Sequence, residues 1–137
     1  MRILTAKQIK AVEENAFETD STEAGLMLNA GTACFEKICK IFGECLVNSR
    51  VAVFCGNGKN AGDGFVIADL LNSINVNADI IICDKEPTVD EPKMYFDKAI
   101  ANGVKVVNFT DIGENSYDII VDCIFGIGSV SYTHLTL

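Results

Sequence analysis

The chain has 137 residues, 49% of them hydrophobic and 22% charged, which is typical of one globular domain with enough apolar side chains for a core. Eleven lysines and arginines face 19 aspartates and glutamates, a formal net charge of −8, and this charge argues against a partner with the phosphate backbone of a nucleic acid. The N-terminus lacks the pattern of a signal peptide and no apolar run is long enough to span a bilayer, so we expect a cytoplasmic protein without a membrane partner.

Two helices are expected before the first strand. Thr5 and Gln8 have the spacing of a capping box, which predicts that the first helix begins at Thr5. The second should begin after Asp20 and end at Gly43, with one broad apolar face. Small residues within positions 30–33 of that face would let another backbone approach it closely.

Short, β-branched, apolar runs predict four strands, with helical patterns between them. Buried parallel strands have this composition, and strands that alternate with helices form a doubly wound α/β sheet. We therefore predict three layers, α/β/α, with the two N-terminal helices added and a 3-2-1-4 strand order. The strands are expected at 51–55, 78–83, 104–109 and 118–125, and the helices at 63–74 and 91–101, with a weaker link at 110–117.

The last nine residues do not continue this alternation of strands and helices. A fourth strand should lead into a further helix and more strands, but the chain stops. We expect a domain over residues 1–128 that is incomplete at its C-terminus, followed by a tail, 129–137, that does not belong to it. The alternative is a genuine short C-terminus.

The six cysteines raise the question of a metal site or disulfides. They form no C-x-x-C pair, and the one histidine, His134, lies close to the end of the chain. We interpret them as small buried hydrophobic residues in a reducing compartment, rather than as zinc ligands. The six are Cys34, Cys39, Cys45, Cys55, Cys83 and Cys123.

The stretch CGNGKNAGDGF, residues 55–65, directly follows the first predicted strand. Doubly wound sheets bind ligands at the carboxyl ends of their strands. Glycines allow tight turns there, and the N-terminus of the next helix offers N–H groups to an anion. Gly56, Gly58 and Ala61 satisfy the dinucleotide fingerprint G-x-G-x-x-G/A. The alternative is a permissive turn between strand and helix that binds nothing.

A second glycine loop ends the stretch DIIVDCIFGIG, residues 118–128, in which Asp122 interrupts an apolar run. In the predicted strand order both loops face one crevice. A buried carboxylate is costly unless it is paired or bound to a cation. The Asn60 amide and the Asp122 carboxylate indicate a hard cation such as K⁺, Mg²⁺ or Ca²⁺ rather than zinc. Alternatively, Asp122 caps backbone amides or pairs with Lys59.

Four segments, in chain order, resemble the NAD(P)H-hydrate epimerase family. CGNGKNAGDGFVIADLL resembles its loop and helix, whose pattern is C-G-x-G-N-N-G-G-D-G. ILTAKQIKAVEENAF and GLMLNAG resemble its two N-terminal helices, and DIIVDCIFGIG resembles its strand before the second ligand loop. The similarity extends from about residue 3 to 128, and it identifies the chain as a member that is truncated at its C-terminus.

The resemblance implies a Rossmann-like, often dimeric enzyme that repairs damaged nicotinamide cofactor. The family interconverts the R and S epimers of hydrated NADH and NADPH at C6, so that a partner dehydratase restores the cofactor from the S form. The resemblance also implies one K⁺ per subunit, held by Asn60 and Asp122. It assigns substrate binding to Lys59, Asn60, Ala61, Gly62 and Asp63 in the first loop and to Gly126, Ile127 and Gly128 in the second.

The chain departs from the family pattern at three positions and beyond the second loop. Lys59 and Ala61 replace an asparagine and a glycine, and Leu28 replaces a glutamate. The family's later segment, with a substrate-contacting aspartate and a further potassium ligand, has no counterpart from Ser129 onward. We therefore assign no catalytic residue. Asp63 at a helix N-terminus is a candidate general base, although a role in positioning the ligand is preferred.

Two other functions stay open. The first is an NAD-dependent oxidoreductase domain, in which Asp84 would hold the adenosine ribose, although Asp84 lies 28 residues beyond Gly56 rather than roughly 20. The second is a binding module that keeps the nucleotide crevice without chemistry.

Overall fold

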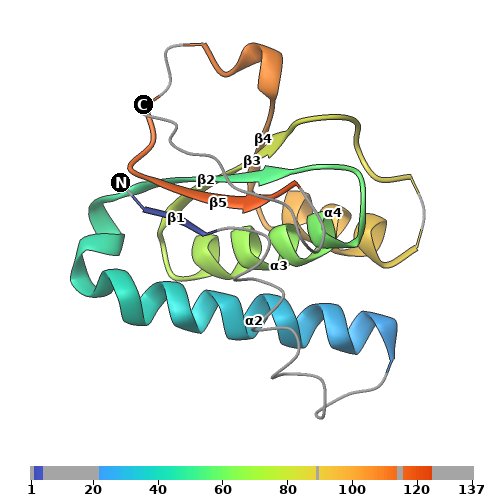
Figure 1. Ribbon diagram of the computed structural model, residues 1–137, viewed down its shortest axis with the longest axis horizontal. Helices are drawn as coiled ribbons and strands as arrows, with labels where there is room; N and C mark the ends of the chain where they lie inside the picture. The colour runs from blue at the N-terminus through green and yellow to red at the C-terminus, as the bar shows by residue number, and fades with distance from the viewer. Residues whose placement is uncertain (1, 5–21, 89, 114–115, 125–137) are drawn as a thin grey trace.

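A computed structural model describes residues 2–4, 22–88, 90–113 and 116–124. A parallel five-stranded sheet forms its centre, with the strand order β1-β5-β2-β3-β4 (Figure 1). The strands are β1 (Arg2–Leu4), β2 (Arg50–Cys55), β3 (Asn77–Ile82), β4 (Lys105–Asn108) and β5 (Ile119–Cys123). The helices are α2 (Glu23–Phe42), α3 (Lys59–Ser73) and α4 (Asp90–Ala101), with 3-10 turns η1 (Gly43–Asn48) and η2 (Phe109–Asp111).

The four predicted strands are confirmed to within two residues at each end, and their order is the predicted one. The chain runs outward from β2 to β3 and β4 and then returns to place β5 on the other side of β2. Strand β1 was not predicted, because three residues carry too little pattern to indicate a strand. It pairs in parallel with β5, with Ile3 opposite Ile120. The helix predicted from Thr5 lies outside the described residues.

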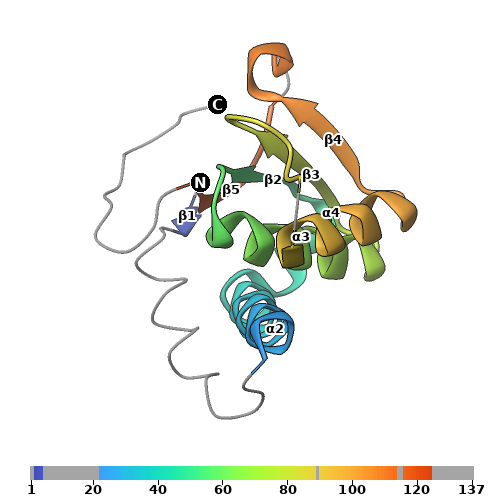
Figure 2. The same cartoon turned by 90° about the vertical axis from the view of Figure 1, so that its right-hand side faces the viewer.

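The α/β fold class is confirmed, and the described α-helices lie together on one side of the sheet. Figure 2 shows α3 and α4 against the sheet and α2 on the side of α3 that faces away from the sheet. The link predicted at 110–117 contains the short turn η2 instead of an α-helix. Among the residues that the structure describes, no helix is long and apolar enough to cross a membrane.

Helices α2 and α3 pack at very short range because glycines lie at their contact. A Cβ atom on Gly31 would lie 2.5 Å from Cγ1 of Val66 and 3.2 Å from the backbone oxygen of Asp63. A Cβ atom on Gly62 would lie on the sulfur of Met27. The small residues of α2 therefore allow another backbone to approach closely, as predicted. That backbone belongs to α3, which contains most of the glycine-rich segment.

A polar cluster holds the segment before β5 against the face of the sheet opposite the helices. Asp79 is 3% exposed, accepts a hydrogen bond of 2.8 Å from the Tyr117 hydroxyl and pairs with Arg50 at 3.5 Å. The Arg50 guanidinium also lies 4.8 Å from the centroid of the Tyr117 ring. Burial, with Asp79 adding to it, raises the pKa of Tyr117 to about 12. The cluster ties β2, β3 and the segment before β5 together through side chains.

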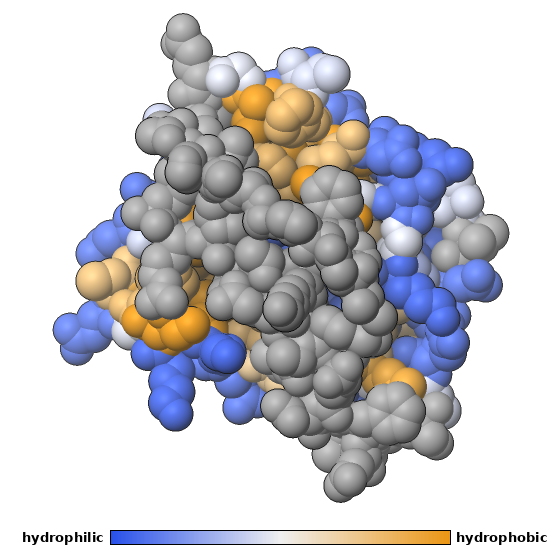
Figure 3. All heavy atoms as spheres, in the orientation of Figure 1, coloured by the Kyte–Doolittle hydropathy of each residue, from blue (hydrophilic) through white to orange (hydrophobic). Residues whose placement is uncertain are grey.

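An apolar cluster beside it extends to the molecular surface. The rings of Phe54 and Phe109 meet edge to face at 6.0 Å between centroids, and Phe109 keeps 48% of its surface exposed. Figure 3 shows apolar surface at the top of the view, in the region of η2.

Candidate functional site

The glycine-rich segment lies at the carboxyl ends of β2 and β5, as predicted, but most of it is helix. Gly56 to Gly58 form the connection, and α3 begins at Lys59, four residues before the predicted start at Asp63. The five residues assigned to substrate binding, Lys59 to Asp63, therefore form the beginning of α3. Asp63 and Ala61 are each only 2% exposed, whereas Asn60 is half-buried and Lys59 is exposed.

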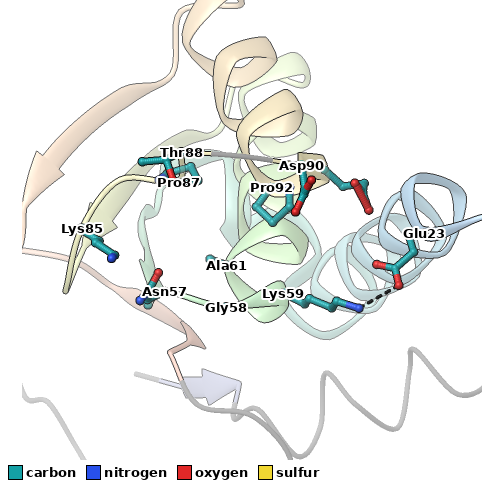
Figure 4. A pocket seen from close by; sticks show the side chains of 12 residues that line it. Glu23, Asn57, Gly58, Lys59, Ala61, Lys85, Pro87, Thr88, Asp90 and Pro92 are labelled. Carbon is teal, nitrogen blue, oxygen red and sulfur yellow. Dashed lines mark hydrogen bonds and ion pairs between the residues drawn. The ribbon is translucent and has the colours of Figure 1, made fainter.

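Lys59 connects α3 to the N-terminus of α2. Its ammonium group donates to Glu23 Oε1 at 2.8 Å (Figure 4). This hydrogen bond is the main cause that lowers the pKa of Glu23, and Glu91 also contributes. Both side chains are largely exposed, with 73% and 56% of their surfaces accessible, so the ion pair adds little to stability. Its importance is that it joins the N-terminal ends of α2 and α3 at the rim of the site.

Asp122 is 7% exposed and lies opposite Phe54 in the β2–β5 register. Its Oδ1 accepts a hydrogen bond of 3.0 Å from the backbone N–H of Ile124, so the amide-capping role considered from the sequence is present. Its charge is close enough to Cys83 to add to burial, the larger cause, in raising the pKa of that thiol to about 11. Gly126, Ile127 and Gly128, the second predicted loop, lie outside the described residues.

Asn60 lies at the start of α3, just after β2, and Asp122 lies near the carboxyl end of the neighbouring strand β5. Their side chains offer amide and carboxylate oxygens, the donors that hard cations prefer. Within the described ranges no group of three or more histidine, cysteine, aspartate or glutamate side chains is placed to hold a metal ion. These donor types fit K⁺, and the potassium site stays a prediction.

Buried thiols lie beneath the start of α3. Cys55 and Cys123 are opposite each other on β2 and β5 and fully buried, and a Cβ atom on Gly64 would lie 2.8 Å from Cys55 Sγ. Burial raises the pKa of both thiols well above the ordinary value and that of Cys34 to about 12, with the Asp63 carboxylate adding to all three. All six cysteines are free. The interpretation as small buried hydrophobic residues is confirmed for Cys34, Cys55 and Cys123. Cys39 and Cys83 are half-buried, and the interpretation is wrong for Cys45, which is exposed.

The buried thiols predict a loss of stability at alkaline pH. Because the folded state binds these protons more tightly than the unfolded state, the stabilisation is complete below about pH 9 and declines as pH rises toward 11–12. Each such thiol should lower the free energy of unfolding by up to about 1.4 kcal/mol per pH unit in that range. Urea unfolding under reducing conditions from pH 7 to 11 measures the slope of the free energy of unfolding against pH.

The variant Cys34→Ala should have a shallower alkaline slope than the parent chain, whereas Cys45→Ala, at an exposed position, should keep the parent slope. Equal slopes for all three proteins would show that Cys34 ionises as readily in the folded chain as in the unfolded one.

A cavity of about 220 Å³ opens on the β3 side of the glycine connection (Figure 4). Sequence reasoning identified only its glycine-loop wall. The other wall comes from the segment after β3 and the start of α4, which lie at the same edge because parallel strands end there together. Asp84, the ribose ligand of the oxidoreductase hypothesis, is exposed and does not line it. The wall that was missed consists of Lys85, Pro87, Thr88, Asp90, Glu91 and Pro92.

Comparison with protein families identifies the family to which this chain belongs. The family described as YjeF-related protein N-terminus matches residues 23–133, most of the chain and all of the glycine-rich segment. The chain belongs to this family. In this member of the YjeF-related family, the start of α3 and the end of β5 lie side by side.

Curated relatives of this YjeF-related chain carry the predicted family name. The NAD(P)H-hydrate epimerase of Roseobacter litoralis is 29% identical over 145 residues, which cover 92% of this chain and 64% of the relative. The bifunctional NAD(P)H-hydrate repair enzyme Nnr of Escherichia coli is 30% identical over 105 residues, covering 75% and 20% respectively. The predicted membership of the NAD(P)H-hydrate epimerase family is thereby confirmed. The chain spans less than two thirds of the length of these relatives.

A solved structure supports the fold. The crystal structure of yeast ynu0, YNL200c, superimposes with a TM-score of 0.68 at 22% identity, and the match covers 98% of this chain and 60% of the yeast chain. At this level of identity the comparison establishes the α/β fold.

Proposed function

We propose that this chain acts as an NAD(P)H-hydrate epimerase, which interconverts the R and S epimers of hydrated NADH and NADPH. The observation that carries the proposal is the glycine-rich segment between β2 and α3 of this YjeF-related domain. A relative of the chain is named NAD(P)H-hydrate epimerase. Several relatives are named bifunctional repair enzymes, which supports a dehydratase, fused or separate, as the functional partner. A homodimer and a cytoplasmic location remain predictions.

The glycine connection is suited to the anionic part of a dinucleotide. Gly58 has open space where its Cβ would lie, so a ligand can approach the backbone there. The N–H groups at the start of α3 then point toward it, and their partial positive charge favours a phosphate. Lys59, paired with Glu23 at 2.8 Å, lies at the rim of the same segment.

The burial of Asp63 favours a positioning role over that of a general base. At 2% exposure its carboxylate lies beneath the first turn of α3, where it borders a cavity of about 80 Å³ with Leu26 and Met27. From there it supports the segment that carries Lys59 and Asn60. No residue is assigned the proton transfers of the reaction.

We propose that Asn60 and Asp122 contribute oxygen ligands to K⁺. A bound K⁺ would offset the buried Asp122 charge and attract the anionic substrate. Asp122 would contribute its carboxylate to the ion and retain the hydrogen bond that it accepts from Ile124. Asn60 would bring the start of α3 to the same ion.

The test is equilibration of the R and S hydrates of NADH and NADPH by this chain, with and without K⁺. We expect epimerisation that depends on K⁺. At a K⁺ concentration that just saturates the parent chain, the variant Asp122→Asn should have a rate about tenfold to a hundredfold lower, since it loses the charge that holds the ion.

The matched control is Asp84→Asn, the same chemical change at an exposed position after β3, and it should leave the rate unchanged. A rate that is independent of K⁺ would contradict the potassium site, and the absence of epimerisation by the folded chain would contradict the proposed activity. Oxidation of NADH coupled to a carbonyl substrate would favour the oxidoreductase alternative.

A further inference from the structure

We propose that the cavity between the starts of α3 and α4 binds the adenosine 5′-phosphate half of the dinucleotide and favours a ribose without a 2′-phosphate. This inference rests on the proposed function and adds to it a subsite, an orientation and a preference for NADH hydrate. The cavity lies on the β3 side of the glycine connection, whereas Asn60 and Asp122 mark the β5 side.

The size of the cavity suits half of a dinucleotide. Pockets that enclose a whole drug-sized ligand are roughly 300–1,000 Å³, and this one is about 220 Å³. A dinucleotide can place only one nucleoside here, and its other half must lie beyond the glycine connection. That direction leads toward β5, the neighbour of β2 on the other side.

The lining is divided by charge into two ends. Figure 4 shows Lys85 and Asn57 at one end and Asp90 at the other, near Glu23 and Lys59. None of the residues that the structure describes forms an ion pair with Lys85. An ammonium and an amide beside the glycine connection suit the 5′-phosphate, because it joins the nucleoside to the rest of the substrate.

The opposite end carries an excess of negative charge. Asp90, Glu91 and Glu23 supply three carboxylates, and Lys59, paired with Glu23, offsets one of them. Carboxylates accept hydrogen bonds from ribose hydroxyls and from the exocyclic amine of adenine. They repel a 2′-phosphate, so this end selects against NADPH hydrate.

Between the two ends the walls are apolar. Pro87, Pro92 and Ala61 line the middle of the cavity (Figure 4). A nucleoside base combines an apolar ring face with polar edges, and a pocket with apolar walls and polar groups at its ends is the usual arrangement for such a ligand. An inorganic phosphate ion would use only the Lys85 end, so we expect it to bind much more weakly.

The experiment measures binding of AMP, adenosine 2′,5′-bisphosphate and inorganic phosphate to the 137-residue chain by isothermal titration calorimetry. We expect AMP to bind, the bisphosphate to bind about fivefold more weakly or worse, and phosphate to show no saturable binding in the same range. AMP should also compete with the hydrate substrate in the epimerase assay.

Two variants locate the site. Lys85→Glu should weaken AMP binding about tenfold or more, since an attraction becomes a repulsion. Thr88→Trp should abolish binding by filling the cavity without removing a charge. Lys105→Glu makes the same charge reversal at an exposed position of β4, outside the cavity, and should bind AMP as the parent chain does. Thermal melting confirms that each variant is folded.

The results test the proposed subsite and the proposed activity separately. If the chain epimerises the hydrates but AMP neither binds nor competes, the subsite is wrong and the proposed function stands. If AMP binds and Lys85→Glu or Thr88→Trp has no effect, the ligand lies elsewhere and the subsite is again wrong. If AMP binding follows the expected pattern without epimerisation, the subsite stands and the activity does not. Tighter binding of the bisphosphate would overturn the preference for NADH hydrate.

Discussion

Replacing Gly31 with leucine should lower the free energy of unfolding by about 2 kcal/mol. Overpacking of a core contact generally costs about 1–3 kcal/mol, and the better helix propensity of leucine returns about 1 kcal/mol of this at most. The contact at Gly31 is among the stiffest in the chain, because the atoms in the way are the β-branched side chain of Val66 and the backbone oxygen of Asp63. Neither can rotate aside, so α2 must move away from α3.

Chemical denaturation of the variant and the parent chain measures this loss. The control is Gly58→Ala, whose new Cβ would meet no atom within 4 Å and whose effect should stay below about 1 kcal/mol. Gly31→Leu should also lower epimerase activity by more than the decrease in folded protein accounts for, because α2 supports the segment with Asp63. If Gly31→Leu unfolds with the parent midpoint, α2 does not pack on α3 at this position.

Replacing Asp79 with alanine should lower the free energy of unfolding by about 2 kcal/mol. The Tyr117 hydroxyl then loses its acceptor in a buried site, which costs about 1–3 kcal/mol. Removing one partner of a buried ion pair generally costs about 3–5 kcal/mol. The loss at Arg50 is smaller, because 36% of its side chain is exposed and water replaces part of the interaction.

A double-mutant cycle with Tyr117→Phe tests whether these groups act together. The combined loss should be less than the sum of the two single losses, because both variants remove the same hydrogen bond. As a control, Asp97→Ala breaks an exposed pair with Lys93 and should change stability by less than about 0.5 kcal/mol. Strict additivity of Asp79→Ala and Tyr117→Phe would show that the cluster does not hold β3 to the segment before β5.

The sequence alone determined the central strands, their order and the place of the glycine segment. Val51–Cys55 is apolar on both faces, and Ile119–Cys123 is so apart from Asp122, as expected of buried parallel strands. The alternation of strands with helices then limits the possible topologies to a few. The same reasoning placed Asn60 and Asp122 at one edge of the sheet, because the ends of parallel strands meet there.

Local pattern did not indicate where α3 begins. Glycine is a poor helix former, so the segment Lys59–Gly62 was interpreted as a loop. Its helical state is stabilised by contacts with distant residues, with Gly62 on Met27 and Gly64 on Cys55. These glycines serve close packing, and that packing buries Asp63.

Tertiary structure alone decided which distant groups meet. Strand β1 exists through its pairing with β5, more than a hundred residues away. The ion pair of Lys59 with Glu23 and the hydrogen bond of Tyr117 to Asp79 each join separate elements. The cavity arises in the same way, from the segments after β2 and β3 and the start of α4. The periodicity of apolar residues in the sequence indicates whether a side chain faces the core. It does not indicate which distant side chain that residue will contact. These contacts therefore follow only from the packing of the whole chain.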